Sequence, residues 1–286
     1  MKRGSHLAKL AVIPLLTSAL VLADAPTYQA EQTARTPKRR AEAVKDDRFT
    51  FVRIQYDSSG GFGESWYRYE GRDWERWETD YPRAERNLLF RLAELTSLVV
   101  NPDPIALRLT DARIFDHPFV FMSDVGWQVL SQQERRQLRL YLERGGFLWV
   151  DDFWGAAEWR NFHRNTAKLA PNWHWKEIPN DHALLSIVYP LDECPQIPAR
   201  IFYAQRRLSY DPPEVHRRPN GGRADLSQVH LMGLFNGDGR LLAVATHNTD
   251  IADGWEREGE SKDFFNKFSI KAYAMAINII VYAQTH

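Results

Sequence analysis

The chain contains a single cysteine, Cys194, among its 286 residues. One thiol excludes an internal disulfide and a zinc site built from several cysteines. Lys and Arg total 37, and Asp and Glu also total 37, so the chain lacks the basic excess of most nucleic-acid-binding proteins. We therefore expect no nucleic-acid partner, and no motif in the sequence indicates a cofactor.

The first 23 residues combine three cations with a short apolar stretch. Lys2, Arg3 and Lys9 precede an apolar stretch at residues 10–23, which is shorter than the roughly 20 residues of a membrane-spanning helix. This order predicts a secretory signal peptide that ends at Ala23, and hence an exported protein, either periplasmic or secreted. The alternative is an uncleaved anchor, and only in that case would the protein meet a membrane.

The remaining chain divides into a polar segment and one long region of globular composition. Residues 24–47 are polar, carry the basic triplet at residues 38–40 and show no apolar periodicity, which predicts a flexible tether. From residue 48 onward there is no long linker and no repeat. We therefore predict a single folded domain at residues 48–286.

Two short apolar runs enclose a well-marked helix in the middle of the chain. Residues 119–122 and 147–150 are continuous apolar runs, typical of buried parallel strands. Between them, Ser131–Glu134 forms a capping box, and Gly145–Gly146 can end a helix in a left-handed turn. Strand, helix and strand in this order predict a βαβ unit with parallel pairing.

Other segments fit the same architecture. Residues 49–56 alternate aromatic and β-branched residues and predict a strand, and Pro82 predicts the start of a helix whose apolar positions are Leu88, Leu92, Leu95 and Val99. The turn at residues 236–239 predicts a hairpin, and residues 264–283 predict a long final helix. Together they predict a three-layer α/β fold with a mainly parallel sheet flanked by helices.

Polar residues follow four of the predicted strands, at residues 56–57, 123–124, 151–152 and 247–250. In an open α/β sheet, ligands bind beyond the carboxyl ends of the strands. Converging carboxylates suit acid/base catalysis or a hard cation, but an Asp in this position also caps helices and braces turns. Candidates for acid/base chemistry are Asp124, Asp151, Asp152 and Asp250. Candidates for a cation are Asp250, Asp253 and Glu256.

We predict that six residues share one rim at this edge, as a ligand site. They are Asp152, Trp154, Asn248, Asp250, Asp253 and Trp255. The chain has 10 Trp, and exposed Trp faces stack on sugar rings while carboxylates accept sugar hydroxyls, which would suit a glycan ligand. The alternative is that the Trp rings pack loops onto the core.

Three further features have a simpler interpretation. Cys194 lies between acidic residues and Pro195, without the helix start that activates a nucleophilic thiol, so we expect a structural role. The glycines in Ser58–Gly63 match no phosphate-binding motif. The arginines of residues 200–223 lie in a Pro-rich stretch, where a solvated surface is favoured over anion binding.

Six motifs stand out along the chain. They are Trp77–Pro82 (WETDYP), Leu109–Phe115 (LTDARIF), Gly145–Gly155 (GGFLWVDDFWG), Pro195–Pro198 (PQIP), His247–Glu256 (HNTDIADGWE) and Asn278–His286 (NIIVYAQTH). In this order they resemble the motifs of the domain of unknown function 4159 family. The resemblance implies a bacterial protein, often exported or membrane-tethered, whose fold is similar to the class I glutamine amidotransferase-like (flavodoxin-like) superfamily. It implies no activity. The superfamily's catalytic Cys at a strand-to-helix elbow has no counterpart here, because Asp124 or Asp151–Asp152 occupy the predicted strand ends.

From these features we expect an exported, non-catalytic binding or scaffold module. Its partner would be a cell-envelope glycan or another protein. One alternative is a carboxylate-dependent hydrolase that acts on cell-envelope glycan. A second alternative is a domain that binds a divalent cation.

Overall fold

The computed structural model describes residues 47–58, 66–69, 71–203, 205–206 and 226–286. The strands are β1 (Val52–Gln55), β2 (Asp57–Ser58), β3 (Trp66–Tyr69), β4 (Arg72–Glu75), β5 (Ile105–Arg108), β6 (Phe119–Ser123), β7 (Gln128–Val129), β8 (Phe147–Asp151), β9 (His174–Glu177), β10 (His230–Phe235) and β11 (Leu241–His247). The helices are α1 (Arg83–Leu95), α2 (Gln132–Glu143), α3 (Gly155–Thr166), α4 (Arg200–Tyr203), α5 (Asp253–Glu256), α6 (Lys262–Phe264) and α7 (Ile270–Thr285). Short 3-10 helices include Arg76–Glu78, and a π-helical turn covers Phe265–Ser269.

A seven-stranded sheet forms the centre of the domain, with the order β5-β1-β6-β8-β11-β10-β9. The first five strands of this order pair in parallel, and β10 and β9 add an antiparallel edge. The predicted parallel pairing of residues 119–122 with 147–150 is confirmed, because β6 and β8 pair over their full length. The predicted three-layer α/β fold is confirmed as well.

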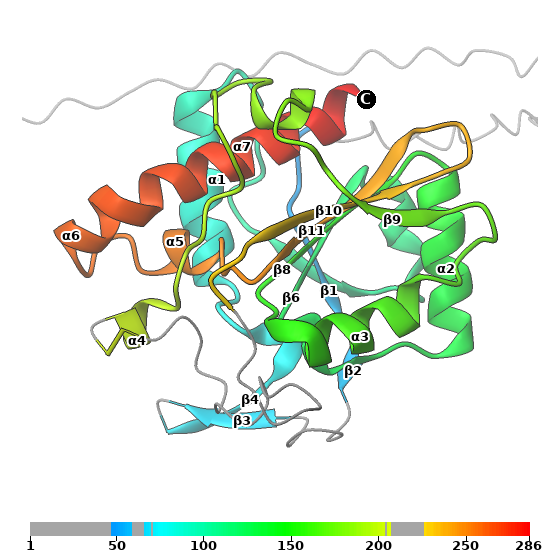
Figure 1. Ribbon diagram of the computed structural model, residues 1–286, viewed down its shortest axis with the longest axis horizontal. Coiled ribbons are helices and arrows are strands. Elements are labelled where there is room, and N and C mark those ends of the chain that lie inside the picture. Colours follow the sequence, from blue (N-terminus) through cyan, green and yellow to red (C-terminus); the bar gives the residue numbers. More distant parts are fainter. Residues whose placement is uncertain (1–46, 59–65, 70, 204, 207–225) are drawn as a thin grey trace, which may run out of the picture. The chain divides into compact units, whose positions relative to one another are not determined.

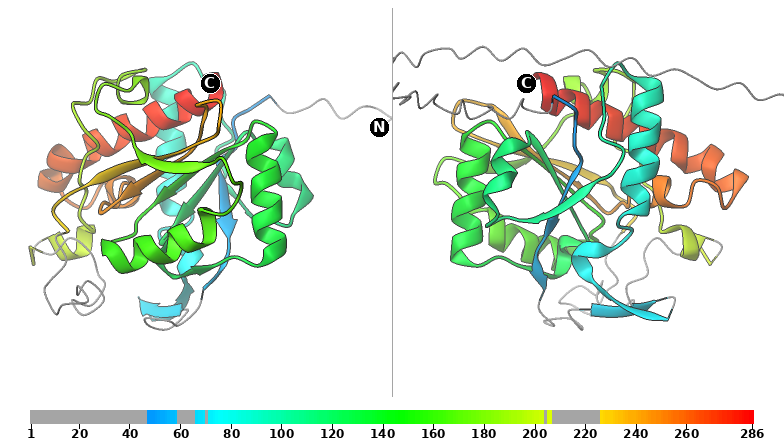
Figure 2. Two further views of the ribbon diagram at one scale, coloured as in Figure 1. Left: turned by 45° about the vertical axis from the view of Figure 1, so that its right-hand side comes forward. Right: turned by 180° about the vertical axis from the view of Figure 1, so that it is seen from behind.

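Helices cover both faces of this sheet. Helices α1 and α7 lie on one face, and α2 and α3 lie on the other (Figures 1 and 2). Two apolar clusters correspond to these layers. One joins leucines of α1 to alternate β-strand residues such as Phe121 and Trp149, and the other joins Leu138 of α2 to Val120 and Val150. Successive residues of a strand therefore supply opposite cores, as the two-residue period of a strand requires.

The helix predicted from the capping box at Ser131 is present as α2. The Ser131 hydroxyl accepts from the Glu134 amide at 3.2 Å, and Glu134 accepts from the Ser131 amide at 2.8 Å. Gly145 takes a left-handed conformation with φ of 102°, as predicted for the helix end. These local contacts specify the crossover between the two central strands.

The prediction for the helix after Pro82 is wrong at its end. Helix α1 stops at Leu95, because Thr96 turns to an extended conformation and its hydroxyl donates to the Leu92 carbonyl at 2.7 Å. Val99 is 67% exposed and does not belong to the helix. The helical spacing of apolar residues in the sequence continues to Val99, but the backbone leaves the helical conformation at Thr96.

The predicted hairpin and final helix are both present. Strands β10 and β11 pair antiparallel around the turn at residues 236–239, and α7 runs to Thr285. No helix in the described ranges is both long enough and apolar enough to span a membrane. The predicted signal segment and the predicted tether up to residue 46 lie outside the described residues, as do most of Ser58–Gly63 and of residues 200–223.

Candidate functional site

The carboxyl ends of the parallel strands carry the polar residues that the sequence singled out. Asp124 follows β6, Asp151 ends β8, and Asn248 follows β11. Because β6, β8 and β11 are parallel neighbours, their ends lie at one edge of the sheet. A bridge between Phe153 and Thr249 ties the two following loops together. The structure therefore brings Asp152 and Asp250 to the same edge.

The backbone at this edge is unusual. Five described non-glycine residues have positive φ, and four of them lie here: Asp80 (65°), Asp124 (54°), Asp152 (53°) and Asn248 (62°), the fifth being Arg206. Asp and Asn tolerate the left-handed conformation better than most residues. Such residues turn the chain sharply as it leaves a strand. A cluster of such residues at one edge is typical of a functional site, but it does not indicate which ligand or reaction the site serves.

Asp151 is a buried structural brace. One carboxylate oxygen accepts from the Thr246 hydroxyl at 2.5 Å, and the other accepts from the Ala252 amide at 2.9 Å. Burial raises the pKa of Asp151 to about 7, although these hydrogen bonds oppose the shift. The side chain links β8 to β11 and to the residue before α5. It has no exposed surface, so as a catalytic candidate it lacks access to a ligand.

Asp124 has a similar structural role. Its Oδ2 pairs with the Arg76 guanidinium at 3.0 Å and accepts from the Thr79 hydroxyl at 3.3 Å. Arg76 also stacks over the Trp127 ring, 4.5 Å from its centroid. The ion pair fixes the 3-10 helix Arg76–Glu78 against the end of β6. Asp124 therefore positions the segment that leads to Asp80.

Asp152 and Asn248 hold the start of α3. Asp152 Oδ1 accepts from the Trp154 indole at 2.9 Å, and Asn248 Oδ1 accepts from the Gly155 amide at 2.7 Å. The Asn248 amide donates in turn to the Gln228 carbonyl at 2.8 Å. These contacts tie the loop after β11 to the helix that follows β8. They satisfy the polar atoms named without any ligand.

The prediction that Trp rings wall an open ligand site is wrong at this rim. Trp154 is 1% exposed and Trp255 is 0% exposed, so neither presents a face to a ligand. Trp255 packs edge-on against Trp149 in the core, with ring centroids 5.5 Å apart. Both rings contribute to stability by burying a large apolar area. They therefore follow the alternative prediction, in which the Trp rings pack loops onto the core. Trp127 and Trp173 are buried too.

Asp250 and Asp253 lie at the start of α5. Asp250 Oδ1 accepts from the Asp253 amide at 2.9 Å, and Asp253 accepts from the Arg200 amide. Burial, and then the charge of Asp152, raise the pKa of Asp250 well above its usual range. Burial, and then the charge of Glu256, raise the pKa of Asp253 to about 7. Both residues thus lie in a strongly acidic environment.

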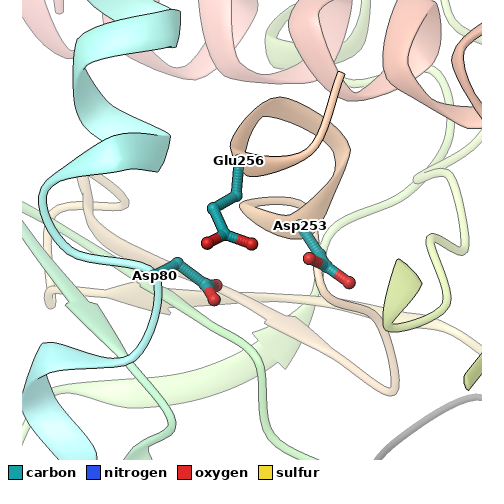
Figure 3. A group of neighbouring side chains, drawn as sticks. All are labelled: Asp80, Asp253 and Glu256. Atoms are coloured by element: carbon teal, nitrogen blue, oxygen red, sulfur yellow. The ribbon is translucent and has the colours of Figure 1, made fainter. Parts of the chain in front are cut away.

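Three carboxylates at this edge face one another. Asp80, from the segment before α1, and Asp253 and Glu256, from α5, each offer an oxygen within 4.8 Å of the other two (Figure 3). The Oδ2 atom of Asp80 is enclosed and accepts no hydrogen bond from the residues described. Burial, and then the charges of Glu256 and Asp253, raise the pKa of Asp80 well above its usual range. Among the residues described, this is the group in which three potential metal-ligating carboxylates come this close together.

Asp80 was not among the site residues predicted from the sequence. Asp80 lies before Pro82 and far from α5 in sequence, so no local spacing connects it to Asp253. Arg53 of β1 holds the segment by donating to the Trp77 and Thr79 carbonyls at 3.2 and 3.0 Å. The conspicuous motif Trp77–Pro82 was the one available indication that the segment matters.

Cys194 is structural, as expected. It is buried, and burial raises the pKa of its thiol well above the usual value, which opposes formation of the reactive thiolate. The neighbouring segment is held to the loop after β11, because the Ile197 amide donates to Thr249 Oγ1 at 2.8 Å. Thr249 donates back to the Pro195 carbonyl at 2.9 Å.

An open cavity of about 580 Å³ lies at the end of β1. Strand β1 has β5 on one side and β6 on the other, so this is the point where the chain switches direction across the sheet. The cavity is lined by residues that follow β1 and by residues of β2, β4 and the 3-10 helix after β4. They are Tyr56, Asp57, Ser58, Asp73, Trp74, Glu75 and Glu78. The cavity is acidic and contains two aromatic side chains.

A family model for a Domain of unknown function (DUF4159) matches residues 50–284. The chain belongs to this family. The match confirms the resemblance drawn from the sequence motifs and covers every residue of the carboxyl edge discussed above. The chain has no significant match among curated proteins. The relation to the glutamine amidotransferase superfamily stays a prediction.

Proposed function

We propose that this protein is a non-catalytic binding module whose ligand is a polyhydroxyl compound of the cell envelope, that is, a glycan fragment. The cavity at the end of β1 is the observation that carries the proposal. It lies where doubly wound α/β folds bind their ligands, and its volume of about 580 Å³ is suited to a small ligand.

The lining of the cavity favours sugars. Trp74 supplies the aromatic surface, and because the Arg72 guanidinium lies over one face of its ring, a ligand would stack on the other face. Tyr56 is buried beneath the cavity, where its hydroxyl donates to the Ser123 and Asp124 carbonyls. Carboxylates such as Asp73 and Glu75 can accept hydrogen bonds from several hydroxyl groups at once. An aromatic platform surrounded by acceptors suits a polyhydroxyl ligand better than an anion, which the acidic residues would repel.

The absence of catalysis is part of the proposal. Asp124 and Asp151 are committed to Arg76, Thr246 and backbone amides, and Cys194 is a buried thiol. A nucleophile needs a neighbouring base and access to the substrate. In the described residues of the carboxyl edge, these groups meet neither condition.

The hydrolase alternative draws support from one observation. Burial, and then the charge of Asp152, raise the pKa of Asp250 well above its usual range, which favours a protonated carboxyl group that could act as a general acid. If the protein hydrolyses envelope glycan, Asp250→Asn should abolish the release of reducing ends. A binding module releases none, with or without this substitution.

Titration calorimetry with soluble envelope glycan fragments tests the proposal. We expect saturable binding that Trp74→Ala weakens at least about fivefold, because an aromatic contact contributes about 1 kcal/mol beyond its buried area. Phe90→Ala is the matched control, since Phe90 is an exposed aromatic residue on α1 outside the cavity. Absence of binding to the parent protein, or equal losses in both variants, would contradict the proposed site.

We further propose that the protein is exported and starts near Asp24. The support is the order of charges and apolar residues in residues 1–23. Mass spectrometry of the protein from its natural source measures the mature N-terminus. A full-length chain in the cytoplasm as the main form would overturn this proposal.

A further inference from the structure

We propose that Asp80, Asp253 and Glu256 form a binding site for a hard divalent cation, and that Ca²⁺ fits it best. The site is separate from the cavity at the end of β1 and does not depend on glycan binding. Carboxylate oxygens are the ligands that such cations prefer.

The chemistry of the three groups favours Ca²⁺ over Mg²⁺. One oxygen from each of the three carboxylates lies within 4.8 Å of the other two (Figure 3). Ca²⁺ accepts flexible arrangements of six to eight oxygen ligands, whereas Mg²⁺ demands a near-ideal octahedron and keeps several of its waters. Carboxylates that converge from two separate segments therefore suit the ion with the less exacting geometry.

A second observation points to a ligand independently of the acidic composition. Asp80 Oδ2 is enclosed, yet no described residue donates a hydrogen bond to it. Burial of a polar atom without a partner is costly, so native structures rarely contain one without a water or ion. Asp80 projects into the space that faces Asp253 and Glu256 (Figure 3). A cation there would satisfy the oxygen and neutralise the mutual repulsion.

The other two carboxylates are held in place by neighbours. Glu256 Oε1 accepts two hydrogen bonds from the Arg83 guanidinium, at 2.9 and 2.5 Å, and Oε2 pairs with Arg257 at 2.6 Å. Asp253 Oδ2 accepts from the Arg200 amide. Each carboxylate oxygen has about two lone-pair sites, so Glu256 Oε2 and Asp253 Oδ1 retain lone pairs for a cation. Such outer contacts orient the ligands of metal sites in general.

Terbium luminescence tests the site directly. Tb³⁺ occupies Ca²⁺ sites, and Trp255 lies between two of the proposed ligands in sequence and can transfer excitation to it. In chelator-treated full-length protein, we expect Tb³⁺ emission under Trp excitation that Ca²⁺ reverses. We also expect Ca²⁺ to raise the melting temperature, because it binds the native state. Asp80→Asn should weaken Ca²⁺ binding at least tenfold.

Asp103→Asn is the matched control, because Asp103 is exposed and pairs only with Arg86 among the contacts described. It should bind Ca²⁺ like the parent. If Asp80→Asn does not fold, Asp253→Asn takes its place. The proposal is overturned if millimolar Ca²⁺ changes neither the emission nor the melting temperature of the parent, or if the Asp80 variant binds Ca²⁺ as tightly as the control.

Discussion

Two groups of acids at the carboxyl edge, all buried except the partly buried Asp80, differ in what surrounds them. The braced acids, Asp124 and Asp151, each accept hydrogen bonds or an ion pair from fixed partners on neighbouring elements. The facing acids, Asp80, Asp253 and Glu256, lie with oxygens within 4.8 Å of one another. Both groups follow the same rule of placement, since they occupy the strand ends and the loops beside them.

The difference indicates which acids the fold needs and which a ligand needs. A buried charge destabilises the native state unless partners replace the water that it has lost. The braced acids have those partners inside the protein, so they stabilise the fold. Among the facing acids, Glu256 and Asp253 have partners such as Arg83 and the Arg200 amide, but Asp80 Oδ2 accepts no hydrogen bond from the residues described. The described contacts of the fold therefore do not account for the position of Asp80. We therefore expect the braced acids to respond to substitution through stability and the facing acids through binding.

The largest expected effect lies beneath the braced acids. Trp149 donates to Thr246 Oγ1 at 3.1 Å, and Thr246 donates to Asp151, so the indole supports the brace from the core. Trp149→Asp would place an unpaired charge in the central strand. We expect the variant to lose more than about 4 kcal/mol of unfolding free energy and to be unfolded at 37 °C. Circular dichroism and urea titration measure this loss.

The control for this substitution is Ile270→Asp. Ile270 is 54% exposed at the point where α7 continues the π-helical turn, so an acid there stays in contact with water. This variant should melt close to the parent temperature. If Trp149→Asp were as stable as Ile270→Asp, the central position of β8 in the core would be contradicted.

The braced region also shows what the sequence could predict. Strands β6 and β8 and helix α2 were predictable because their determinants are local, namely two apolar runs and the capping box at Ser131. The shared edge followed from parallel pairing. In contrast, Asp80 reaches α5 through contacts of Arg53 and Arg76 with residues distant in sequence, and no periodicity encodes such contacts.

The burial of the Trp rings could not be predicted for the same reason. Trp154 and Trp255 follow strand ends, where a ring can face either solvent or core. The outcome depends on partners such as Trp149, which packs against Trp255 from another strand. Residue type and position indicated the site edge, but only the tertiary packing determined which side chains are accessible.

The second effect concerns the ion pair of a braced acid. Arg76→Met would leave Asp124 buried without its cation, because the Asp124 side chain is 2% exposed. Loss of one partner of a buried pair costs about 3 to 5 kcal/mol. Urea unfolding at pH 7 measures the cost. Asp124→Asn in the Arg76→Met background should recover part of it, because no unpaired charge remains.

Arg113→Met is the comparison for that variant. Arg113 pairs with Asp111 on the surface, with 67% of its side chain exposed, so its removal should cost less than about 1 kcal/mol. Similar costs for Arg76→Met and Arg113→Met would show that the Asp124 pair is not a structural brace.

The third effect is the pH dependence of stability. His247, at the end of β11, is buried near His230, and burial lowers its pKa to about 4. Below about pH 6.5, His247 binds a proton in the unfolded state but stays neutral in the native state. The free energy of unfolding therefore falls as the pH falls from about 6.5 to about 4. The loss is on the order of 3 kcal/mol. Asp250 acts with the opposite sign, because its pKa is raised and the native state binds the extra proton.

Comparison of variants separates these contributions. His247→Gln should remove the loss between pH 7 and pH 4, as measured by urea unfolding at both values. His230→Gln, which changes a partly exposed ring paired with Glu177, should retain it. An unchanged pH dependence in His247→Gln would show that His247 is not the group responsible.

The smallest effect has the opposite sign and belongs to the facing acids. Asp80→Asn removes one of three like charges and keeps both the side-chain shape and a residue that tolerates the left-handed φ of 65°. In chelator at pH 8, we expect the variant to be more stable by about 1 kcal/mol, because a neutral amide faces Asp253 and Glu256 in place of a third carboxylate. Ca²⁺ should stabilise the parent and leave the variant unchanged.

Asp103→Asn is the control and should shift the free energy of unfolding by less than about 0.5 kcal/mol in either condition, as exposed substitutions do. If Asp80→Asn were instead destabilised as strongly as Arg76→Met, Asp80 would be a braced acid, and the distinction between the two groups would fail.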